Sequence, residues 1–521
     1  MTLPHLGSLA WPFEVRITSK RQMRQLSELL AGLEVIESSG PLGIPVAGLA
    51  YDSRQVEAGY LFAALPGTRS DGHRYLGQAL ERGATAVLIR PEGKALVPAS
   101  GQATALVVGD ARVALAQVSA AFYGYPSRSL RIIGVTGTNG KTTITYLVEA
   151  ILRGADRRTG VIGTLAYRIG EQTIAAKHTT PEAPDLQAVL AQMVEAKVGD
   201  VAMEVSSHAL AQHRADFTEI EVAVFTNLTR DHLDYHANVD EYLQAKRRLF
   251  IAPELQPTRH PRVNVVNADD PASDQLVQGT QAPLVRYGLS EGAEIRATDV
   301  EVSVTGTSFA LITPTGRYGV RLQLLGRFNV YNALAALAVA YAQGLDLPRA
   351  IGALEAVAPI SGRFQRVGDG RRCTVVVDYA HSPDGLEQAL FTAREMTRGR
   401  VIAVFGCGGD RDTGKRPLMG GIAARLADLC VITSDNPRSE PPEQIIEQIW
   451  EGVPEEQRSR CLREPDRRRA IEQAIDRAGP DDVVVIAGKG HENYQIFADR
   501  TIHFDDREVA EQALSSQGVG R

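Results

Sequence analysis

The stretch that decides the fold of this chain is Ile132-Ile133-Gly134-Val135-Thr136-Gly137-Thr138-Asn139-Gly140-Lys141-Thr142-Thr143. The apolar run at residues 130–135 predicts a buried strand, and the apolar residues after Thr143 recur at helical spacing. A glycine-rich turn between a strand and a helix presents backbone N–H groups and a helix N-terminus to an anion. We therefore expect a phosphate-binding loop here.

This loop departs from the strict Walker pattern. That pattern places a glycine where this chain has Val135, and the glycines stand at positions 134 and 137 instead. Lys141 is still expected to reach the terminal phosphates, and the Thr142 hydroxyl to ligate Mg²⁺. The alternative is an ordinary strand-to-helix turn, which the preceding strand and the amphipathic helix disfavour.

Length, charge and cysteine use bound the protein class. A chain of 521 residues predicts two to four domains. The net charge of −6 with no basic tail argues against nucleic acid as a partner. Four cysteines without a C-x-x-C pair fit a reducing cytoplasm. No signal-peptide pattern is seen, and the apolar stretch at residues 332–345 is too short to span a bilayer, so we expect a cytoplasmic protein without membrane insertion.

Three blocks follow one another along the chain. Residues 1–127 hold short strands and helices, and residues 128–360 contain the phosphate loop and a stretch at 295–325 that alternates as antiparallel strands do. In residues 361–521 four apolar strands alternate with helical segments, which predicts a parallel, doubly wound sheet. These strands are expected at residues 373–378, 401–405, 429–433 and 483–487. The predicted fold class is thus α/β, in three domains.

Each strand of the third block ends in polar or glycine-rich sequence. The segments are Asp378-Tyr379-Ala380-His381, Gly406-Cys407-Gly408-Gly409-Asp410, Ser434-Asp435-Asn436-Pro437-Arg438 and Gly488-Lys489-Gly490-His491-Glu492. Ligands of open α/β sheets bind beyond the carboxyl ends of strands, so these segments predict a site for a charged molecule. Plain turns favour Gly, Asn, Asp and Pro but do not require Arg411, Arg438, His491 or Glu492. The glycines do not form G-x-G-x-x-G, which disfavours a nicotinamide cofactor.

The second block carries a further concentration of polar residues. Met203-Glu204-Val205-Ser206-Ser207-His208 ends a predicted strand, and a carboxylate there suits a second ligand for the Mg²⁺ on Thr142. The segment Thr226-Asn227-Leu228-Thr229-Arg230-Asp231-His232-Leu233-Asp234-Tyr235-His236 indicates a site, with a solvated loop as the alternative. The segment at residues 242–250 predicts an amphipathic helix, in which pattern alone does not distinguish Lys246 from a solvated charge.

In this order, these motifs resemble the Mur ligase family, the ATP-dependent amide-forming enzymes of peptidoglycan synthesis. Gly326-Arg327-Phe328-Asn329-Val330-Tyr331-Asn332 also matches, and the resemblance runs from about residue 52 to residue 506. Asp435-Asn436-Pro437-Arg438 is similar to the segment of the branch that uses meso-2,6-diaminopimelate. The resemblance implies addition of that amino acid to UDP-N-acetylmuramoyl-L-alanyl-D-glutamate through an acyl phosphate. It implies a UDP-binding first domain, a central ATPase-like domain and a Rossmann-like C-terminal domain.

The resemblance also implies a role for each matching residue. Catalysis would fall to Lys141, His232, Lys246 and Arg363. ATP would be bound by Gly137, Thr138, Asn139, Gly140, Lys141, Thr142, Thr143, Asn329, Asn332, Asp378 and His381. One Mg²⁺ would lie on Thr142 and Glu204, and a second on His232 and Lys246, the latter as a CO₂-derived carbamate. The UDP substrate would meet Tyr51, Ser53, Thr68, Arg69, Ser70, Thr179, Thr180, Ser206, Gln212 and Arg214. Diaminopimelate would meet Arg411, Asp435, Asn436, Pro437, Arg438, Gly488 and Glu492.

Three alternatives stay open from the sequence. The folylpolyglutamate synthetase branch shares the phosphate loop and the modified lysine, but lacks this first domain and the Asp-Asn-Pro-Arg segment. A lysine-adding ligase is disfavoured by Arg438. A nucleotide-binding switch would need neither an amino acid nor a UDP-linked peptide for phosphate release. We expect the partners to be small-molecule substrates and the protein to be a monomer.

Overall fold

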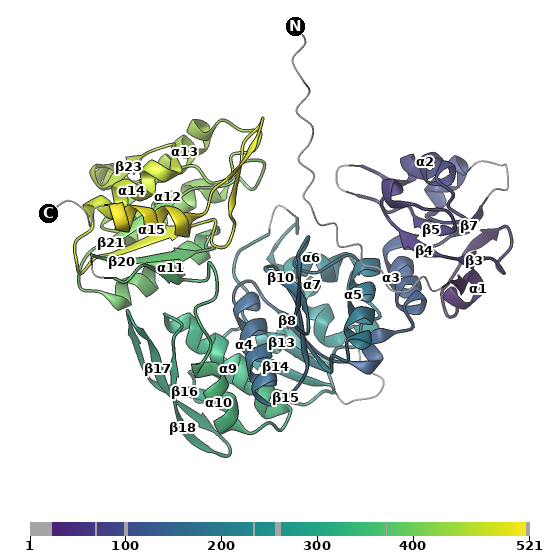
Figure 1. Cartoon of the computed structure of the whole chain (residues 1–521), viewed down its shortest axis with the longest axis horizontal. Helices are drawn as coiled ribbons and strands as arrows, with labels where there is room; N and C mark the ends of the chain where they lie inside the picture. The colour runs from purple at the N-terminus through teal and green to yellow at the C-terminus, as the bar shows by residue number, and fades with distance from the viewer. Residues whose placement is uncertain are drawn as a thin grey trace, which may run out of the picture.

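The protein is described by a computed structural model that covers residues 23–67, 70–97, 103–232, 235–255, 262–370 and 372–516. Two residues of the predicted UDP site, Thr68 and Arg69, lie outside the described residues. Three sheets succeed one another along the molecule, each with helices on its faces (Figure 1).

The first sheet is small and mostly parallel. Its strand order is β2-β7-β6-β5-β4, with the edge strand β2 antiparallel to β7. Helices α1 and α3 pack on one face and α2 on the other. The strands of this block are β1 Arg24–Gln25, β2 Glu37–Ser39, β3 Pro45–Val46, β4 Gly48–Ala50, β5 Tyr60–Ala63, β6 Ala86–Ile89 and β7 Thr104–Val107. The helices are α1 Leu26–Leu29, α2 Leu76–Glu81 and α3 Ala111–Phe122.

The central sheet has eleven described strands in the order β11-β10-β9-β12-β8-β13-β14-β15-β16-β17-β18. Its strands are β8 Arg131–Thr136, β9 Thr159–Ile162, β10 Ala166–Ile169, β11 Gln172–Ala175, β12 Asp200–Glu204, β13 Val222–Phe225, β14 Val263–Asn267, β15 Leu284–Gly288, β16 Ile295–Ser303, β17 Gly306–Thr313 and β18 Gly316–Leu322. The antiparallel strands predicted at residues 295–325 are confirmed as β16 to β18. They do not form a separate sheet, because β16 pairs in parallel with β15 and so extends the central sheet.

Helices cover both faces of the central sheet. They are α4 Lys141–Gly154, α5 Ala183–Glu195, α6 Ser207–Ala211, α7 Val239–Ile251, α8 Ser273–Val277, α9 Arg327–Ala342 and α10 Leu347–Glu355. The alanine-rich part of helix α9, residues 333–340, is buried on all sides because the helix lies between α4 and the sheet. Small alanine side chains let these layers approach closely, and helices α5 to α8 cover the opposite face.

The third sheet confirms the predicted doubly wound arrangement. Its order is β19-β20-β24-β21-β22-β23, and β20 to β24 are all parallel. The strands are β19 Gln365–Val367, β20 Thr374–Asp378, β21 Val401–Phe405, β22 Leu429–Ile432, β23 Cys461–Arg463 and β24 Val483–Ala487, with a separate hairpin of β25 Tyr494–Ile496 and β26 Thr501–His503. Helices α11 Pro383–Met396, α12 Lys415–Leu426 and α13 Pro442–Trp450 cover one face, and α14 Arg467–Arg477 and α15 Asp506–Ser516 the other.

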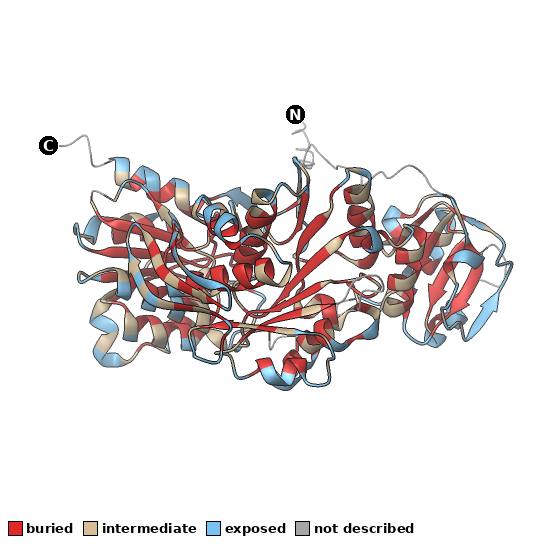
Figure 2. Ribbon diagram, turned by 90° about the horizontal axis from the view of Figure 1, so that it is seen from below, coloured by how far each residue is buried: buried red, intermediate tan, exposed pale blue. Residues whose placement is uncertain are grey.

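Burial follows these layers (Figure 2), where the inner strands of the sheets are buried and the outer helix surfaces are exposed, as are the short strands β2 and β26. The predicted boundaries after residues 127 and 360 fall between the strands of successive sheets, and the division at those residues stays a prediction. None of the helices in the described ranges combines the length and apolar character needed to cross a membrane.

Candidate active site

The predicted strand, glycine turn and helix are confirmed around the phosphate loop, since β8 ends at Thr136 and α4 begins at Lys141. Gly137 has a φ of +146°, and a Cβ there would lie 1.8 Å from Thr226 Oγ1. Gly140 has a φ of +89°, and a Cβ there would lie 2.5 Å from Asn332 Oδ1. Both positions therefore need glycine, because each has a positive φ and leaves no room for a side chain.

Lys141 lies across the loop. Its Nζ donates to the carbonyls of Gly137 at 2.9 Å and Thr138 at 2.8 Å. Burial lowers the pKa of Lys141, while the nearby Glu204 and Asp231 carboxylates act to raise it. The amine is thus held where backbone N–H groups and the start of α4 already favour an anion.

The Thr142 hydroxyl, in the first turn of α4, connects two other elements. It donates to Glu204 Oε2 at 3.0 Å, at the carboxyl end of β12. Glu204 also accepts from the Thr164 backbone N–H at 2.8 Å and from its hydroxyl at 3.1 Å. Arg363, which precedes the third sheet, donates from Nη2 to Thr142 Oγ1 at 3.0 Å. Hydroxyl and carboxylate oxygens together form a donor set of the kind Mg²⁺ prefers.

Lys246 and His232 lie beside this group. Lys246 is only 1% exposed on α7, with Nζ 4.1 Å from the centre of the Tyr242 ring. Burial lowers the pKa of Lys246 well below its ordinary value, and the Lys141 charge lowers it further. His232 has a φ of +57°, and burial lowers its pKa to about 3. Burial therefore favours the neutral form of both nitrogen groups, the form that can react or ligate.

These groups share one cavity of about 850 Å³. It is lined by the predicted residues Gly137, Thr138, Asn139, Gly140, Lys141, Thr142, Thr143, Thr179, Thr180, Glu204, Ser206, Arg214, His232, Lys246, Asn332, Arg363, Asp378 and His381. Among the described residues, Asn329 is not part of this lining, because its side chain turns back to the Leu325 carbonyl at 2.8 Å. It acts on the cavity through Asn332, whose Nδ2 donates to Asn329 Oδ1 at 2.9 Å.

The residues predicted for the dipeptide end of the UDP substrate gather at the end of β12. Thr180 Oγ1 donates to the Glu204 carbonyl at 2.8 Å and accepts from the Ser206 N–H at 3.1 Å. Arg214 donates to the Thr180 carbonyl at 3.2 Å and to Gln212 Oε1 at 2.7 Å. This polar wall is therefore continuous with the Thr142 and Glu204 group.

The described residues of the predicted uridine site, Tyr51, Ser53 and Ser70, lie outside the strands of the first sheet and do not line the cavity. Tyr51 donates to Asp185 Oδ2 of α5 at 2.7 Å, so it also joins the first sheet to the central domain. Ser53 donates to Gln78 Oε1 at 2.6 Å. The hydroxyls of Ser70 and Tyr75 are 3.0 Å apart. A substrate that touches all these residues has to extend along the molecule.

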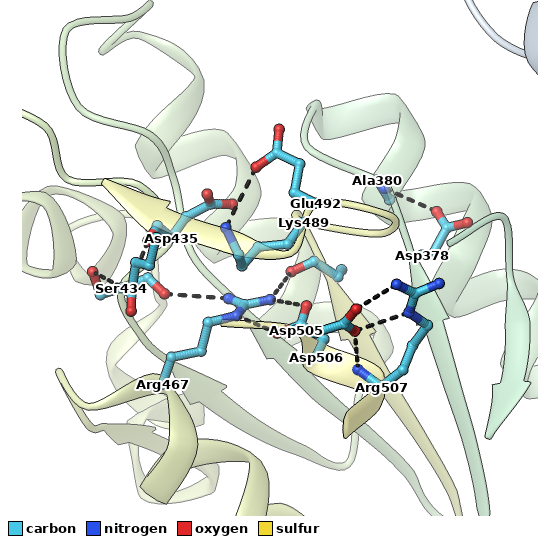
Figure 3. A network of polar contacts seen from close by, with 12 residues as sticks. Asp378, Ala380, Ser434, Asp435, Arg467, Lys489, Glu492, Asp505, Asp506 and Arg507 are labelled. Atoms are coloured by element: carbon cyan, nitrogen blue, oxygen red, sulfur yellow. Dashed lines mark hydrogen bonds and ion pairs between the residues drawn. The ribbon is translucent and has the colours of Figure 1, made fainter. Parts of the chain in front are cut away.

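A second polar cluster forms at the carboxyl ends of β22 and β24 (Figure 3). Asn436 Nδ2 donates to Glu492 Oε2 at 2.8 Å, and Lys489 Nζ lies 3.4 Å from the same oxygen. Gly488 has a φ of +118°, and a Cβ there would lie 2.5 Å from Asp435 Oδ2. The structure thus brings together four residues of the predicted amino-acid site, although it separates them from the cavity lining.

Arg438 and Arg411 complete this cluster. A Cβ on Gly408 would lie 2.9 Å from Arg438 Nη1 and 3.8 Å from Arg411 Cγ, so both arginines flank one glycine. Arg438 has a φ of +53° and donates to the Gly409 carbonyl at 2.8 Å. A left-handed backbone at a residue with a long side chain is uncommon and marks a position set by its surroundings. Pro437, which precedes Arg438, restricts the same turn.

Three further residues line the cavity at the phosphate loop but were not singled out from the sequence. Asp384, in the first turn of α11, accepts from Asn139 Nδ2 at 2.8 Å and from Thr229 Oγ1 at 3.0 Å. Thr164 lies in a loop without any motif. Asp269 follows β14 and accepts from the Tyr331 hydroxyl at 2.9 Å. The strand-end rule could have indicated Asp269, whereas contacts made between distant segments left no local signal.

Comparison with known proteins assigns each part of the chain. Residues 45–123 match the profile described as Mur ligase family, catalytic domain. Residues 135–340 match the Mur ligase middle domain, and residues 362–490 match Mur ligase, glutamate ligase domain. A protein of Syntrophomonas wolfei subsp. wolfei named UDP-N-acetylmuramoyl-L-alanyl-D-glutamate--2,6-diaminopimelate ligase is 46% identical over 94% of this chain and 99% of its own length. A Geobacter metallireducens protein of the same name is 46% identical over 95% of this chain and 100% of its own.

Solved structures agree with this assignment. The structure of a ligase of that same name aligns with a TM-score of 0.67 and 36% identity, covering 95% of this chain and all of its own. The MurF ligase of Thermotoga maritima in complex with ADP aligns with a TM-score of 0.61 over 90% of this chain and 98% of its own, at 18% identity, and shows the shared fold alone. This chain therefore belongs to the Mur ligase family.

Proposed function

We propose that this protein is an ATP-dependent amide ligase that adds meso-2,6-diaminopimelate to UDP-N-acetylmuramoyl-L-alanyl-D-glutamate in peptidoglycan precursor synthesis. Relatives of that name match nearly the whole chain. The observation that carries the proposal is the contact of Thr142 with both Glu204 and Arg363, which joins a phosphate loop, a carboxylate and a second domain.

The first step is phosphoryl transfer. The γ-carboxylate of the D-glutamate attacks the γ-phosphorus of ATP, the bond to ADP breaks, and an acyl phosphate forms. Both reacting groups are anions, so catalysis consists mainly of alignment and charge compensation. Lys141 and Arg363 supply two fixed positive charges at the phosphate loop. The cavity wall at Thr180, Ser206 and Arg214 would hold the dipeptide.

Enzymes of this family use ATP and Mg²⁺. Thr142 and Glu204 would hold one ion, and His232 with the carbamate of Lys246 a second. Bound there, the ions supply positive charge that offsets the repulsion between carboxylate and phosphate. The described residues contain no group of three or more His, Cys, Asp or Glu side chains placed to hold a metal, so each set depends on a hydroxyl or a carbamate oxygen.

The carbamate on Lys246 is supported by the burial of its amine. CO₂ adds only to a neutral amine: nitrogen bonds to carbon, one N–H proton leaves, and a carboxylate remains. Burial lowers the pKa of Lys246 well below its ordinary value, which favours the neutral amine. The carbamate presents carboxylate oxygens instead of an amine nitrogen, and oxygen is the ligand that Mg²⁺ prefers.

In the second step the amine of diaminopimelate attacks the acyl phosphate, and a tetrahedral intermediate collapses to amide and phosphate. Arg438 offers a planar fork for the distant carboxylate of this amino acid. Asp435 and Glu492 would accept from the ammonium beside that carboxylate, with Asn436, Gly488, Pro437 and Arg411 shaping the pocket. Water has to be excluded while the acyl phosphate lasts, which closure of the third domain would achieve.

The remaining assignments complete the proposal. Tyr51, Ser53, Thr68, Arg69 and Ser70 would bind the uridine end. We place the protein in the cytoplasm as a monomer. The deciding experiment measures phosphate release with ATP, the UDP-linked dipeptide and single amino acids. Release that requires both other substrates supports a ligase, and release with ATP alone contradicts it. Equal use of lysine and diaminopimelate would refute the proposed amino-acid choice.

A further inference from the structure

The guanidinium of Arg467, at the start of α14, is fully buried beside the second polar cluster (Figure 3). We call that cluster, formed by Asp435, Asn436, Gly488 and Glu492 with Arg411 and Arg438, the amino-acid cluster. The side chains of Arg467 and Asp506 both have 0% exposure. Nε donates to Asp506 Oδ1 and Nη2 to Asp506 Oδ2, each at 2.7 Å. This is a bidentate pair that joins the two helices on one face of the third sheet.

The other guanidinium N–H groups reach two strand ends. Nη1 donates to the Ser434 carbonyl at 3.2 Å, and Nη2 donates to the Ala487 carbonyl at 3.0 Å. Ser434 directly precedes Asp435, and Ala487 directly precedes Gly488. The strands that lead to them, β22 and β24, are not neighbours, because β21 lies between them. The two strands are linked only through their ladders with β21, so Arg467 adds a direct link between their ends, beside the bond from Asn436 to Glu492.

The same guanidinium also faces a proposed binding group. A Cβ on Gly488 would lie 2.5 Å from Asp435 Oδ2 and 3.9 Å from Arg467 Nη2. Asp435 is itself buried, so its carboxylate needs a nearby compensating charge. Arg467 thus holds the backbone on both sides of the pocket and lies beside its acid.

A buried ion pair contributes little net stability compared with well-packed apolar residues, because desolvation opposes the attraction. The guanidinium of Arg467 nevertheless fixes the positions of its acceptors, since its five N–H donors point in set directions. We infer that Arg467, held by Asp506, is a positioning residue that sets the geometry of the amino-acid pocket through the backbones of Asp435 and Gly488. This inference rests on the proposed function, because it assigns that cluster to the incoming amino acid.

The same sheet offers a control pair at the other ends of its strands. Arg400 and Asp482 directly precede β21 and β24, and Arg400 donates to Asp482 Oδ2 from Nε at 3.0 Å and from Nη2 at 2.7 Å. Like Arg467 and Asp506, this is an arginine–aspartate pair, although the Arg400 side chain is 51% exposed and that of Arg467 is 0% exposed. It lies at the amino ends of the strands, away from every residue assigned to a substrate.

The test compares Arg467→Lys with Arg400→Lys in the full-length protein. Lysine keeps the charge but loses the bidentate and two-carbonyl geometry. For Arg467→Lys we expect the KM for diaminopimelate to rise on the order of tenfold to a hundredfold, since small displacements of a site cost that much. The KM values for ATP and for the UDP-linked dipeptide should change less than about twofold. Arg400→Lys should leave all three values unchanged.

Three outcomes overturn the inference. They are an unchanged KM for diaminopimelate, an equal rise for all three substrates, and the same rise in Arg400→Lys. If Arg467→Lys does not fold, Asp506→Asn is measured in the same way, and failure of both to fold makes the pair a stability element only. A wild-type protein without diaminopimelate-dependent phosphate release would instead refute the proposed function.

Discussion

The guanidinium of Arg363 donates to the hydroxyl of Thr142 across 221 positions of sequence, at 3.0 Å. Arg363 precedes the third sheet, whereas Thr142 lies in the phosphate loop of the central one. The guanidinium carbon of Arg363 lies 4.8 Å from the centre of the Tyr379 ring, which packs against it. A residue that precedes the third sheet therefore reaches the loop between β8 and α4, and we expect it to complete the predicted phosphate site.

This contact predicts that Arg363→Lys slows the chemical step. Lysine cannot keep both the contact with Thr142 and the packing on Tyr379, so the charge moves away from the transferred phosphate. We expect kcat to fall on the order of a hundredfold, with a smaller change in the KM for ATP. Arg366→Lys is the control, because Arg366 bonds to the Val304 and Asp369 carbonyls. An equal loss in both variants would indicate a folding defect.

Replacing Lys246 by alanine should abolish nearly all activity. The variant lacks the nitrogen on which the carbamate forms, and an added short-chain carboxylic acid should restore part of the turnover by supplying carboxylate oxygens. Arg247→Ala, on the same helix, is the control, since Arg247 bonds to the Gln278 carbonyl at the surface. Full activity of Lys246→Ala without any added acid would disprove the carbamate.

Glu204→Gln should raise the Mg²⁺ concentration needed for half-maximal turnover, because a neutral amide is a weaker ligand than a carboxylate. Binding of the UDP-linked dipeptide, measured by calorimetry, should change far less. Loss of both to the same extent would assign Glu204 a folding role through its bonds to Thr164.

Arg438→Ala should raise the KM for diaminopimelate steeply and leave those for ATP and the UDP substrate nearly unchanged. In the wild-type protein, lysine would leave the Arg438 fork without a carboxylate, and an unmatched group of this kind can cost a factor of roughly 10⁴ in discrimination. Ligation assays with both amino acids measure this ratio. Comparable use of the two would contradict the assignment of Arg438.

The pair of Glu440 and Arg416 predicts a pH-dependent stability. Hydrogen bonds from the buried Arg416 lower the pKa of Glu440. The stability gained by the ionised form is thus fully present above the unfolded pKa of about 4.3, and is lost as the pH falls through the folded pKa. Glu440→Gln should lower the free energy of unfolding by about 1–3 kcal/mol near neutral pH. Urea unfolding should show this difference shrinking in acid, and a constant difference would contradict the assignment.

Four strands of the third sheet, β20, β21, β22 and β24, were predictable because apolar residues run through them without interruption, as in strands buried on both faces. The edge strands β19 and β23 were not predicted. The hairpin of β25 and β26 was not predicted, because each strand is three residues long and β26 is fully exposed. Short exposed strands carry no periodic signal.

The candidate site divides in the same way. Lys141 and Thr142 follow from a local pattern, since one turn sets their geometry. Asp384 and Thr164 act through contacts with distant segments, which no spacing in the sequence encodes. Asn329 and Asn332 share a helix face, yet only Asn332 lines the cavity, because the start of α9 places Asn329 against the Leu325 carbonyl.

The amino-acid cluster lies at the ends of β22 and β24 in the third sheet, whereas the loop between β8 and α4 belongs to the central sheet, and this has an evolutionary consequence. None of the residues predicted to bind the amino acid lines the cavity at that loop, so their side chains can be exchanged without altering the lining of the cavity. A descendant of this chain could thus acquire a new amino acid while inheriting the predicted ATP site intact, since function resides in sites carried by a fold.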